Sequence, residues 1–163
     1  MSDMWSAVIG GIIGLMGVFV GSWLAARFSV QQQQRQNRVQ ALLNLYSEFQ
    51  SESMLESRIK AGAAFDSNIS DLPLGFSNLR QKIGDSNWFH VSKVVHFFEK
   101  YAVYYNSNCL DTNLTKVTLD RYFIYWYNNH SLKLLVKSSL ERDFDEWGAW
   151  AKSVKQLADK LRA

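Results

Sequence analysis

The feature that most constrains this chain is a stretch of 23 residues, 4–26, that contains no charged side chain. As an α-helix it would be about 35 Å long, enough to cross a hydrocarbon core of about 30 Å. Trp5 and Trp23 would lie about 27 Å apart along the axis, which suits two indoles at the two membrane interfaces. A cleaved signal peptide starts with basic residues, whereas the only charge before this stretch is Asp3. We therefore predict a retained transmembrane helix over residues 1–28.

The charges that flank this helix predict its orientation. Arg27, Arg35 and Arg38 follow the apolar stretch, and the positive-inside rule places them in the cytoplasm. The chain would then be a single-pass protein with its N-terminus outside and its C-terminal part cytoplasmic. Its single cysteine, Cys109, agrees with a reducing compartment.

Glycines recur along one side of the predicted membrane helix. Gly10 and Gly14 form one small-xxx-small pair, and Gly17 and Gly21 form another. Such spacing lets two helix backbones approach closely, which favours association within the bilayer. Although glycine is common in membrane helices generally, the repeated spacing favours a homo-oligomer, and a ring of such helices could enclose a pore.

The remainder of the chain has the composition of a packed helical domain. Hydrophobic residues make up 47% and aromatic residues 14%, which excludes a disordered chain. Residues 29–38, SVQQQQRQNR, are polar and predict a juxtamembrane connector, either a helical stalk or a flexible linker. Residues 39–163 predict a single cytosolic helical domain, with a loop at 66–75 around Pro73, the only proline. The expected helices cover 39 towards 64, 88–107, 112–127, 132–137 and 141–161. The expected core face of 88–107 consists of Val91, Val94, Val95, Phe98, Tyr101, Ala102 and Tyr105, and the apolar stripe of 141–161 consists of Trp147, Trp150, Val154, Leu157 and Leu161. The helix 112–127 is apolar nearly all round, and its only clearly polar strip is Lys116, Asp120 and Tyr127. The expected fold class is thus all-α, with one N-terminal transmembrane helix followed by a helical bundle.

No standard catalytic signature is present in the sequence. It lacks the phosphate-binding, dinucleotide-binding, zinc-protease and nucleophile-elbow motifs. Cys109 has no obvious base beside it. Three histidines and one cysteine leave little material for a metal centre. We therefore expect a protein that is not an enzyme and that needs no cofactor or metal, although an anchored enzyme with an unfamiliar site remains a third alternative.

The basic part of the chain is also its aromatic part. Residues 80–142 carry nine basic and five acidic side chains. On the helix expected at 88–107, the side away from the predicted core shows Lys93, His96, Phe97, Lys100 and Tyr104 at three- and four-residue intervals. Cations alternating with rings suit a single-stranded nucleic acid or a nucleotide, because lysines meet phosphates and rings stack on bases. The alternative is an ordinary solvated helix face whose rings pack on a neighbour.

Arg121 is a second candidate ligand-binding residue. A helical wheel places it among Leu114, Val117 and Ile124, inside the apolar face of the expected helix 112–127. A buried guanidinium needs an anionic partner. That partner is either Glu99 on the preceding helix or a phosphate of a ligand, which arginine can bind bidentately.

The run HFFEKYAVYYNSNCLDTNLTKVTLDRYFIYWY, residues 96–127, resembles an uncharacterised family of small bacterial helical proteins that have one N-terminal membrane helix. The architecture is also similar to membrane effectors of anti-phage defence such as the Hailong effector. The resemblance implies an oligomer in the bacterial inner membrane. Its cytosolic domain would bind a nucleotide second messenger or oligonucleotide made by a partner nucleotidyltransferase, and this ligand would control a membrane pore.

The leading hypothesis is therefore an oligomeric membrane effector of anti-phage defence whose cytosolic domain binds a nucleic-acid or nucleotide ligand. The alternative is a membrane-anchored adaptor that binds a protein partner through its aromatic surface.

Overall fold

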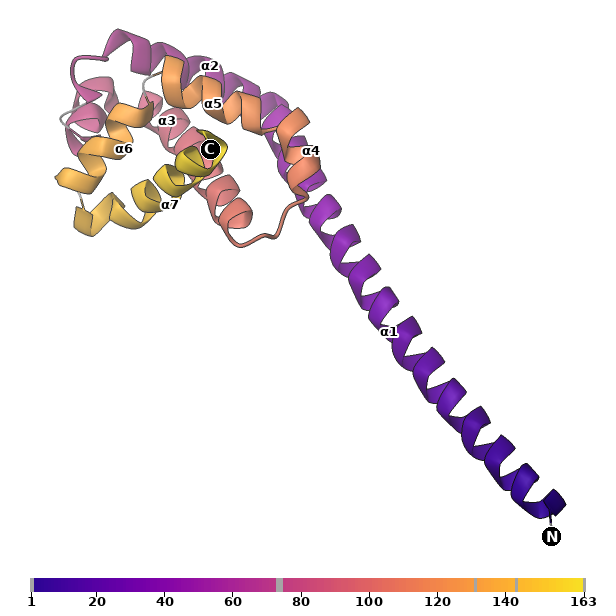
Figure 1. The fold of residues 1–163 in the computed structure, drawn as a ribbon. Coiled ribbons are helices and arrows are strands. Elements are labelled where there is room, and N and C mark those ends of the chain that lie inside the picture. Colours follow the sequence, from indigo (N-terminus) through magenta and orange to yellow (C-terminus); the bar gives the residue numbers. More distant parts are fainter. Residues whose placement is uncertain (1, 73–74, 131, 143, 163) are drawn as a thin grey trace. The chain divides into compact units, whose positions relative to one another are not determined.

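The structure, a computed structural model, describes the backbone of residues 2–72, 75–130, 132–142 and 144–162. It describes the side chains of the same residues except 2–15 and 144–146. The described elements are α1 (Ser2–Gln50), α2 (Glu52–Ser67), α3 (Phe76–Asn106), α4 (Thr112–Val117), α5 (Asp120–Asn129), α6 (Leu132–Glu141) and α7 (Phe144–Arg162) (Figure 1). All elements in these residues are helices, which confirms the all-α fold class. Pro73, predicted to lie in a loop, falls outside the described residues.

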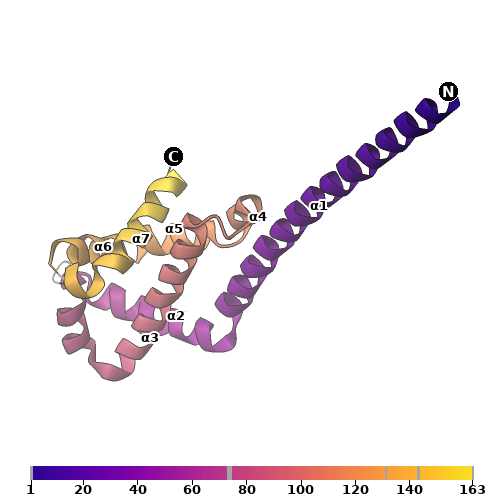
Figure 2. The same cartoon turned by 90° about the horizontal axis from the view of Figure 1, so that it is seen from below.

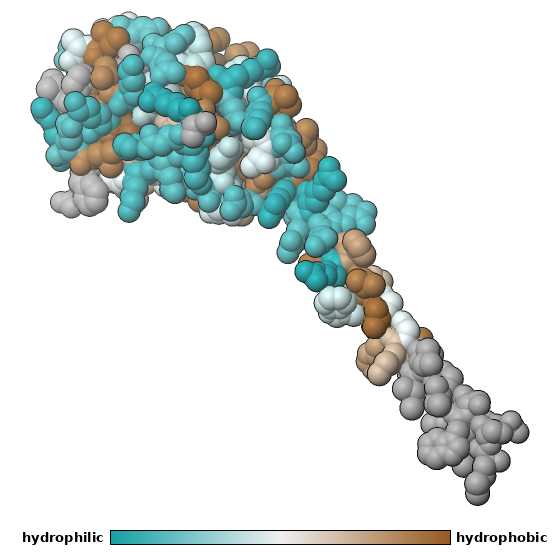
Figure 3. Space-filling model, viewed as in Figure 1, coloured by the Kyte–Doolittle hydropathy of each residue, from teal (hydrophilic) through white to brown (hydrophobic). Residues whose placement is uncertain are grey.

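The chain divides into two compact units, Met1–Asn37 and Arg38–Ala163. In the first unit the described residues belong to α1. Their large apolar side chains between residues 16 and 30 are exposed. Figure 3 shows this apolar stretch on the N-terminal side of the polar connector. Within the part of the chain that was described, no helix offers an apolar stretch long enough to cross a membrane. The side chains of residues 4–15, including Gly10 and Gly14, lie outside that part, so the transmembrane helix stays a prediction.

The second unit begins with the last three turns of α1. Leu42, Leu45 and Phe49 are buried there, at the spacing of one helix face. The sequence predicted that this helix would continue towards residue 64, but α1 ends at Gln50 and α2 starts at Glu52. Ser51 explains the break: its backbone is extended and its hydroxyl accepts a hydrogen bond from the Met54 amide, which caps α2.

Helix α3 supplies the centre of the core. The predicted core face at positions 91, 94, 95, 98, 101 and 102 is buried, and Tyr105 packs against the same core. The prediction placed Phe97 on the outer side, which is wrong, because Phe97 is buried against Phe49 of α1. The predicted start near residue 88 reflects a real break, since Gly84 has a left-handed backbone (φ 73°) that separates two helical parts of α3.

The single helix predicted over residues 112–127 is two helices, α4 and α5. The Thr118 hydroxyl donates to the Leu114 carbonyl, and the backbone of Thr118 leaves the helical region. Because a new helix, α5, begins at Asp120, the side chains of Asp120 and Tyr127 turn towards the core. Both are buried, so the predicted polar strip of this segment is wrong at these two positions.

Helices α6 and α7 pack against each other and close the core (Figure 2). The apolar stripe predicted for the last helix is confirmed at Trp150, Val154 and Leu157, which are buried. The Trp150 indole also donates a hydrogen bond to the Val95 carbonyl of α3, at 3.2 Å. Both the burial of apolar side chains and this hydrogen bond therefore hold α7 against α3.

Candidate functional site

The predicted ligand-binding stripe on α3 makes contacts within the protein. Lys93 Nζ donates to the Ser53 carbonyl at 3.3 Å, and Lys100 Nζ lies 2.7 Å from a carboxylate oxygen of Glu48. His96 Nδ1 lies 3.1 Å from a Glu99 carboxylate oxygen. Lys100 is therefore ion-paired with the end of α1, whereas Lys93 donates to a backbone carbonyl at the start of α2 and has no carboxylate partner among the described residues.

Tyr104, the aromatic member of that stripe, is 37% exposed. Its ring is therefore accessible on α3, beside Lys100, which is ion-paired with Glu48, and His96, which lies next to Glu99. The role of this stripe in ligand binding stays a prediction.

Arg121 does not lie inside the apolar face of its helix. Its side chain is exposed at the N-terminal end of α5, and no ion pair joins it to Glu99 among the described residues. The split between α4 and α5 is the reason, because it rotates Arg121 away from the face that a continuous helix would have given it. Arg121 instead donates a hydrogen bond to the Tyr122 hydroxyl at 3.4 Å and lies 5.0 Å from that ring.

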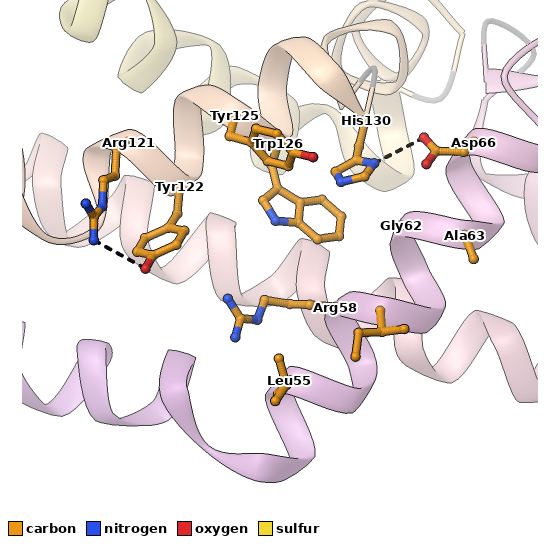
Figure 4. A pocket seen from close by; sticks show the side chains of 11 residues that line it. Leu55, Arg58, Gly62, Ala63, Asp66, Arg121, Tyr122, Tyr125, Trp126 and His130 are labelled. Carbon is orange, nitrogen blue, oxygen red and sulfur yellow. Dashed lines mark hydrogen bonds and ion pairs between the residues drawn. The ribbon is translucent and has the colours of Figure 1, made fainter.

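Arg121 lines a groove between α2 and α5, which we call the α2–α5 groove (Figure 4). The groove has a volume of about 700 Å³. Its lining residues are Leu55, Arg58, Ile59, Gly62, Ala63 and Asp66 from α2, and Arg121, Tyr122, Tyr125, Trp126 and His130 from α5 and its C-cap. Most of this lining is apolar or aromatic, and two guanidinium groups stand at one end.

The two arginines of the groove have no carboxylate partner. Neither Arg58 nor Arg121 forms an ion pair with any carboxylate in the described part of the chain. The Arg58 guanidinium lies 3.9 Å above the Phe49 ring, and its Nε is buried without a hydrogen-bond partner among the described residues. Burial lowers the pKa of this guanidinium, yet arginine stays charged at neutral pH. The two guanidinium charges at this end of the groove therefore have no carboxylate partner among the described residues, and the Asp66 carboxylate of the groove lies beside His130.

His130 and Asp66 form the opposite end of the groove. His130 Nδ1 lies 3.1 Å from an Asp66 carboxylate oxygen, and the imidazole contacts the Trp126 ring at 4.5 Å between centroids. Gly62 on α2 lies against this imidazole, and a Cβ there would be 3.2 Å from His130 Cε1, a tight contact to which the ring would have to adjust slightly. The glycine therefore leaves room for the His130 ring beside α2 at this end of the groove.

This geometry suits a ligand that combines negative charge with a flat or apolar part. Guanidinium groups bind phosphate and carboxylate oxygens, and aromatic side chains stack on planar rings. The sequence analysis identified Arg121 but missed Arg58. A signal was present, because Arg58 lies four residues from both Met54 and Gly62, which are buried on the same face of α2.

The comparisons with protein families, with curated proteins and with solved structures find no match for this chain.

Proposed function

We propose that this protein is a membrane effector whose second unit binds a nucleotide or a short single-stranded oligonucleotide in the α2–α5 groove. The observation that carries the proposal is the pair of guanidinium groups without carboxylate partners, Arg58 and Arg121, beside the rings of Tyr122, Tyr125 and Trp126. Phosphates would bind at the arginines, and a base would stack along the aromatic wall.

The membrane half of the proposal is based on the sequence. Residues 4–26 have the length, the absence of charge and the flanking arginines of a single-pass helix. Helix α1 also includes the exposed apolar side chains of residues 16–30, which water alone would solvate poorly. In this proposal copies of α1 associate through the glycines in the inner membrane, and ligand binding controls the passage of ions, as in the defence effectors that the architecture resembles.

Ligand titrations of the purified full chain in detergent micelles test the binding half. The probe is a short 5′-phosphorylated oligodeoxyadenylate of about four nucleotides, at about 50 and 200 mM salt. We expect affinity to fall with salt and to drop about tenfold or more in Arg121→Gln, since a charge-assisted contact is worth about 1.5–3 kcal/mol. Arg80→Gln is the matched control, because Arg80 is exposed, pairs with Asp85 and does not line the groove.

The same titrations separate the groove from the α3 stripe. Lys93→Gln and Lys100→Gln should leave affinity close to that of the wild type if the ligand occupies the groove. Equal losses in Arg121→Gln and Arg80→Gln would remove the groove from the proposal, and selective loss in the two lysine variants would return the site to the stripe.

A specific observation favours the adaptor as the second candidate. Leu55, Ile59 and Tyr125 border the groove and are 48%, 66% and 49% exposed. An acidic, amphipathic segment of a partner protein could cover these side chains and reach both arginines. No oligonucleotide binding at the lower salt would favour this reading. A nucleotidyltransferase gene beside the gene of this protein would favour the effector.

A further inference from the structure

The α2–α5 groove and the end of α1 share one side chain, Arg58. Its position on α2 places it in the groove lining, while its Cζ lies 3.9 Å from the centroid of the Phe49 ring in the last turn of α1. Because Nε is buried without a described hydrogen-bond partner, the contact with the ring is the main interaction that holds this cation in place.

Phe49 is the point where several parts of the core meet. It is fully buried, and its ring lies 5.0 Å from those of both Phe97 on α3 and Tyr122 on α5. The Tyr122 hydroxyl in turn accepts the hydrogen bond from Arg121. Arg58 thus contacts Phe49 in the last turn of α1 directly. Arg121 is linked to Phe49 indirectly, through the Tyr122 side chain.

We propose that Arg58 and Phe49 form a relay that couples occupancy of the groove to the order of the last turn of α1. An anion in the groove offers Arg58 the hydrogen-bond acceptors that it lacks, and the guanidinium then moves from the Phe49 ring towards the anion. Phe49 loses the cation that covers it, and the end of α1 opens more often. The inference rests on the proposed function only in requiring that the groove binds an anion.

The relay has two definite arrangements, Arg58 on the ring and Arg58 on the ligand, which is what an energetic coupling between two places in a protein requires. Lysine keeps the charge but lacks the planar, weakly hydrated guanidinium, so its contact with the Phe49 ring should be weaker. Arg58→Lys should therefore keep the charge of the groove and lose the relay.

Amide hydrogen exchange of residues 42–50 in the full chain, with and without the same oligodeoxyadenylate, tests the relay. In the wild type the ligand should raise exchange there by about fivefold or more. In Arg58→Lys exchange should already be raised without ligand and should not respond to it, while Arg80→Lys should behave as the wild type. Phe49→Leu should also lose the response. If that variant does not fold, Arg58→Lys decides the question.

Each outcome separates the relay from the proposed function. Binding without any change in the exchange of residues 42–50 overturns the relay and leaves the groove as the ligand site. A ligand response that persists in Arg58→Lys also overturns it. No binding to the wild type overturns the anion site itself, and the relay with it.

Discussion

Asp120 is the one acidic side chain that is buried within the described core, and its environment is unusual for a carboxylate. It accepts a hydrogen bond from the Tyr101 hydroxyl, and both side chains lie between α3 and α5. Burial raises the pKa of Asp120, and burial together with Asp120 raises the pKa of Tyr101. The folded state therefore holds a proton on Asp120 more tightly than the unfolded state does. Stability then falls as pH rises from about 4 towards the raised pKa.

Tyr101→Phe should lower the free energy of unfolding by about 1–3 kcal/mol, because it leaves a buried carboxylate without its donor. The loss should be larger at pH 8 than at pH 4, since the charged carboxylate needs the hydrogen bond more than the protonated one. Urea unfolding of the full chain in detergent, followed by tryptophan fluorescence, measures both values. Tyr105→Phe is the matched control, because Tyr105 lies beside Tyr101 but its hydroxyl makes no hydrogen bond to Asp120. A loss that does not depend on pH would contradict this account.

At the scale of elements, the breaks between helices decide which side chains meet. Ser51 ends α1 and caps α2, Gly84 divides α3, and Thr118 separates α4 from α5. Each break lies at a residue type that favours it: a serine cap, a glycine with positive φ and a threonine that bonds back to the previous turn. The break at Thr118 turns Asp120 into the core and Arg121 into the groove, so the site depends on it.

Gly17 and Gly21 of α1 have no packing role within the described part of one chain. A Cβ built at Gly17 or Gly21 would meet nothing within 4 Å. Gly17→Leu should therefore cause no clash in a single copy and should raise helix propensity. If copies of α1 pack through these glycines, the same change should abolish membrane depolarisation, as read by a potential-sensitive dye in cells at equal expression. Val18→Leu is the control on the same helix. Unchanged depolarisation in Gly17→Leu would exclude the glycine stripe from the mechanism.

At the scale of the whole molecule, the proposed function places the first unit in the membrane and the second unit in water. The second unit has a buried core that includes Phe65, Phe98 and Leu157, as a domain in water does. The described part of the first unit exposes Phe19, Trp23 and other apolar side chains, which a bilayer would cover.

The full chain should remain with membranes through high-salt and alkaline washes and be released only by detergent, because a spanning helix is not held by charge. Deletion of residues 1–28 should release the remainder. The exposed thiol of Cys109, the only cysteine, reports the orientation. A membrane-impermeant maleimide should label it only after the cells are broken. Release of the intact protein by salt alone would contradict the anchor, and labelling in intact cells would contradict the orientation.

The sequence by itself determined the helical class and most of the core faces of α3 and α7. Apolar residues at three- and four-residue spacing, such as Val91, Val95 and Phe98, and later Val154 and Leu157, predicted burial correctly. Such periodicity is a local property, because a helix has the same 3.6-residue repeat wherever it packs. The tertiary structure alone decided the groove. Arg58 and Arg121 are 63 positions apart and line the same groove, which the tertiary arrangement of α2 and α5 and the break at Thr118 create together. No periodicity within one segment records such an arrangement, because it depends on which faces of two distant helices pack together.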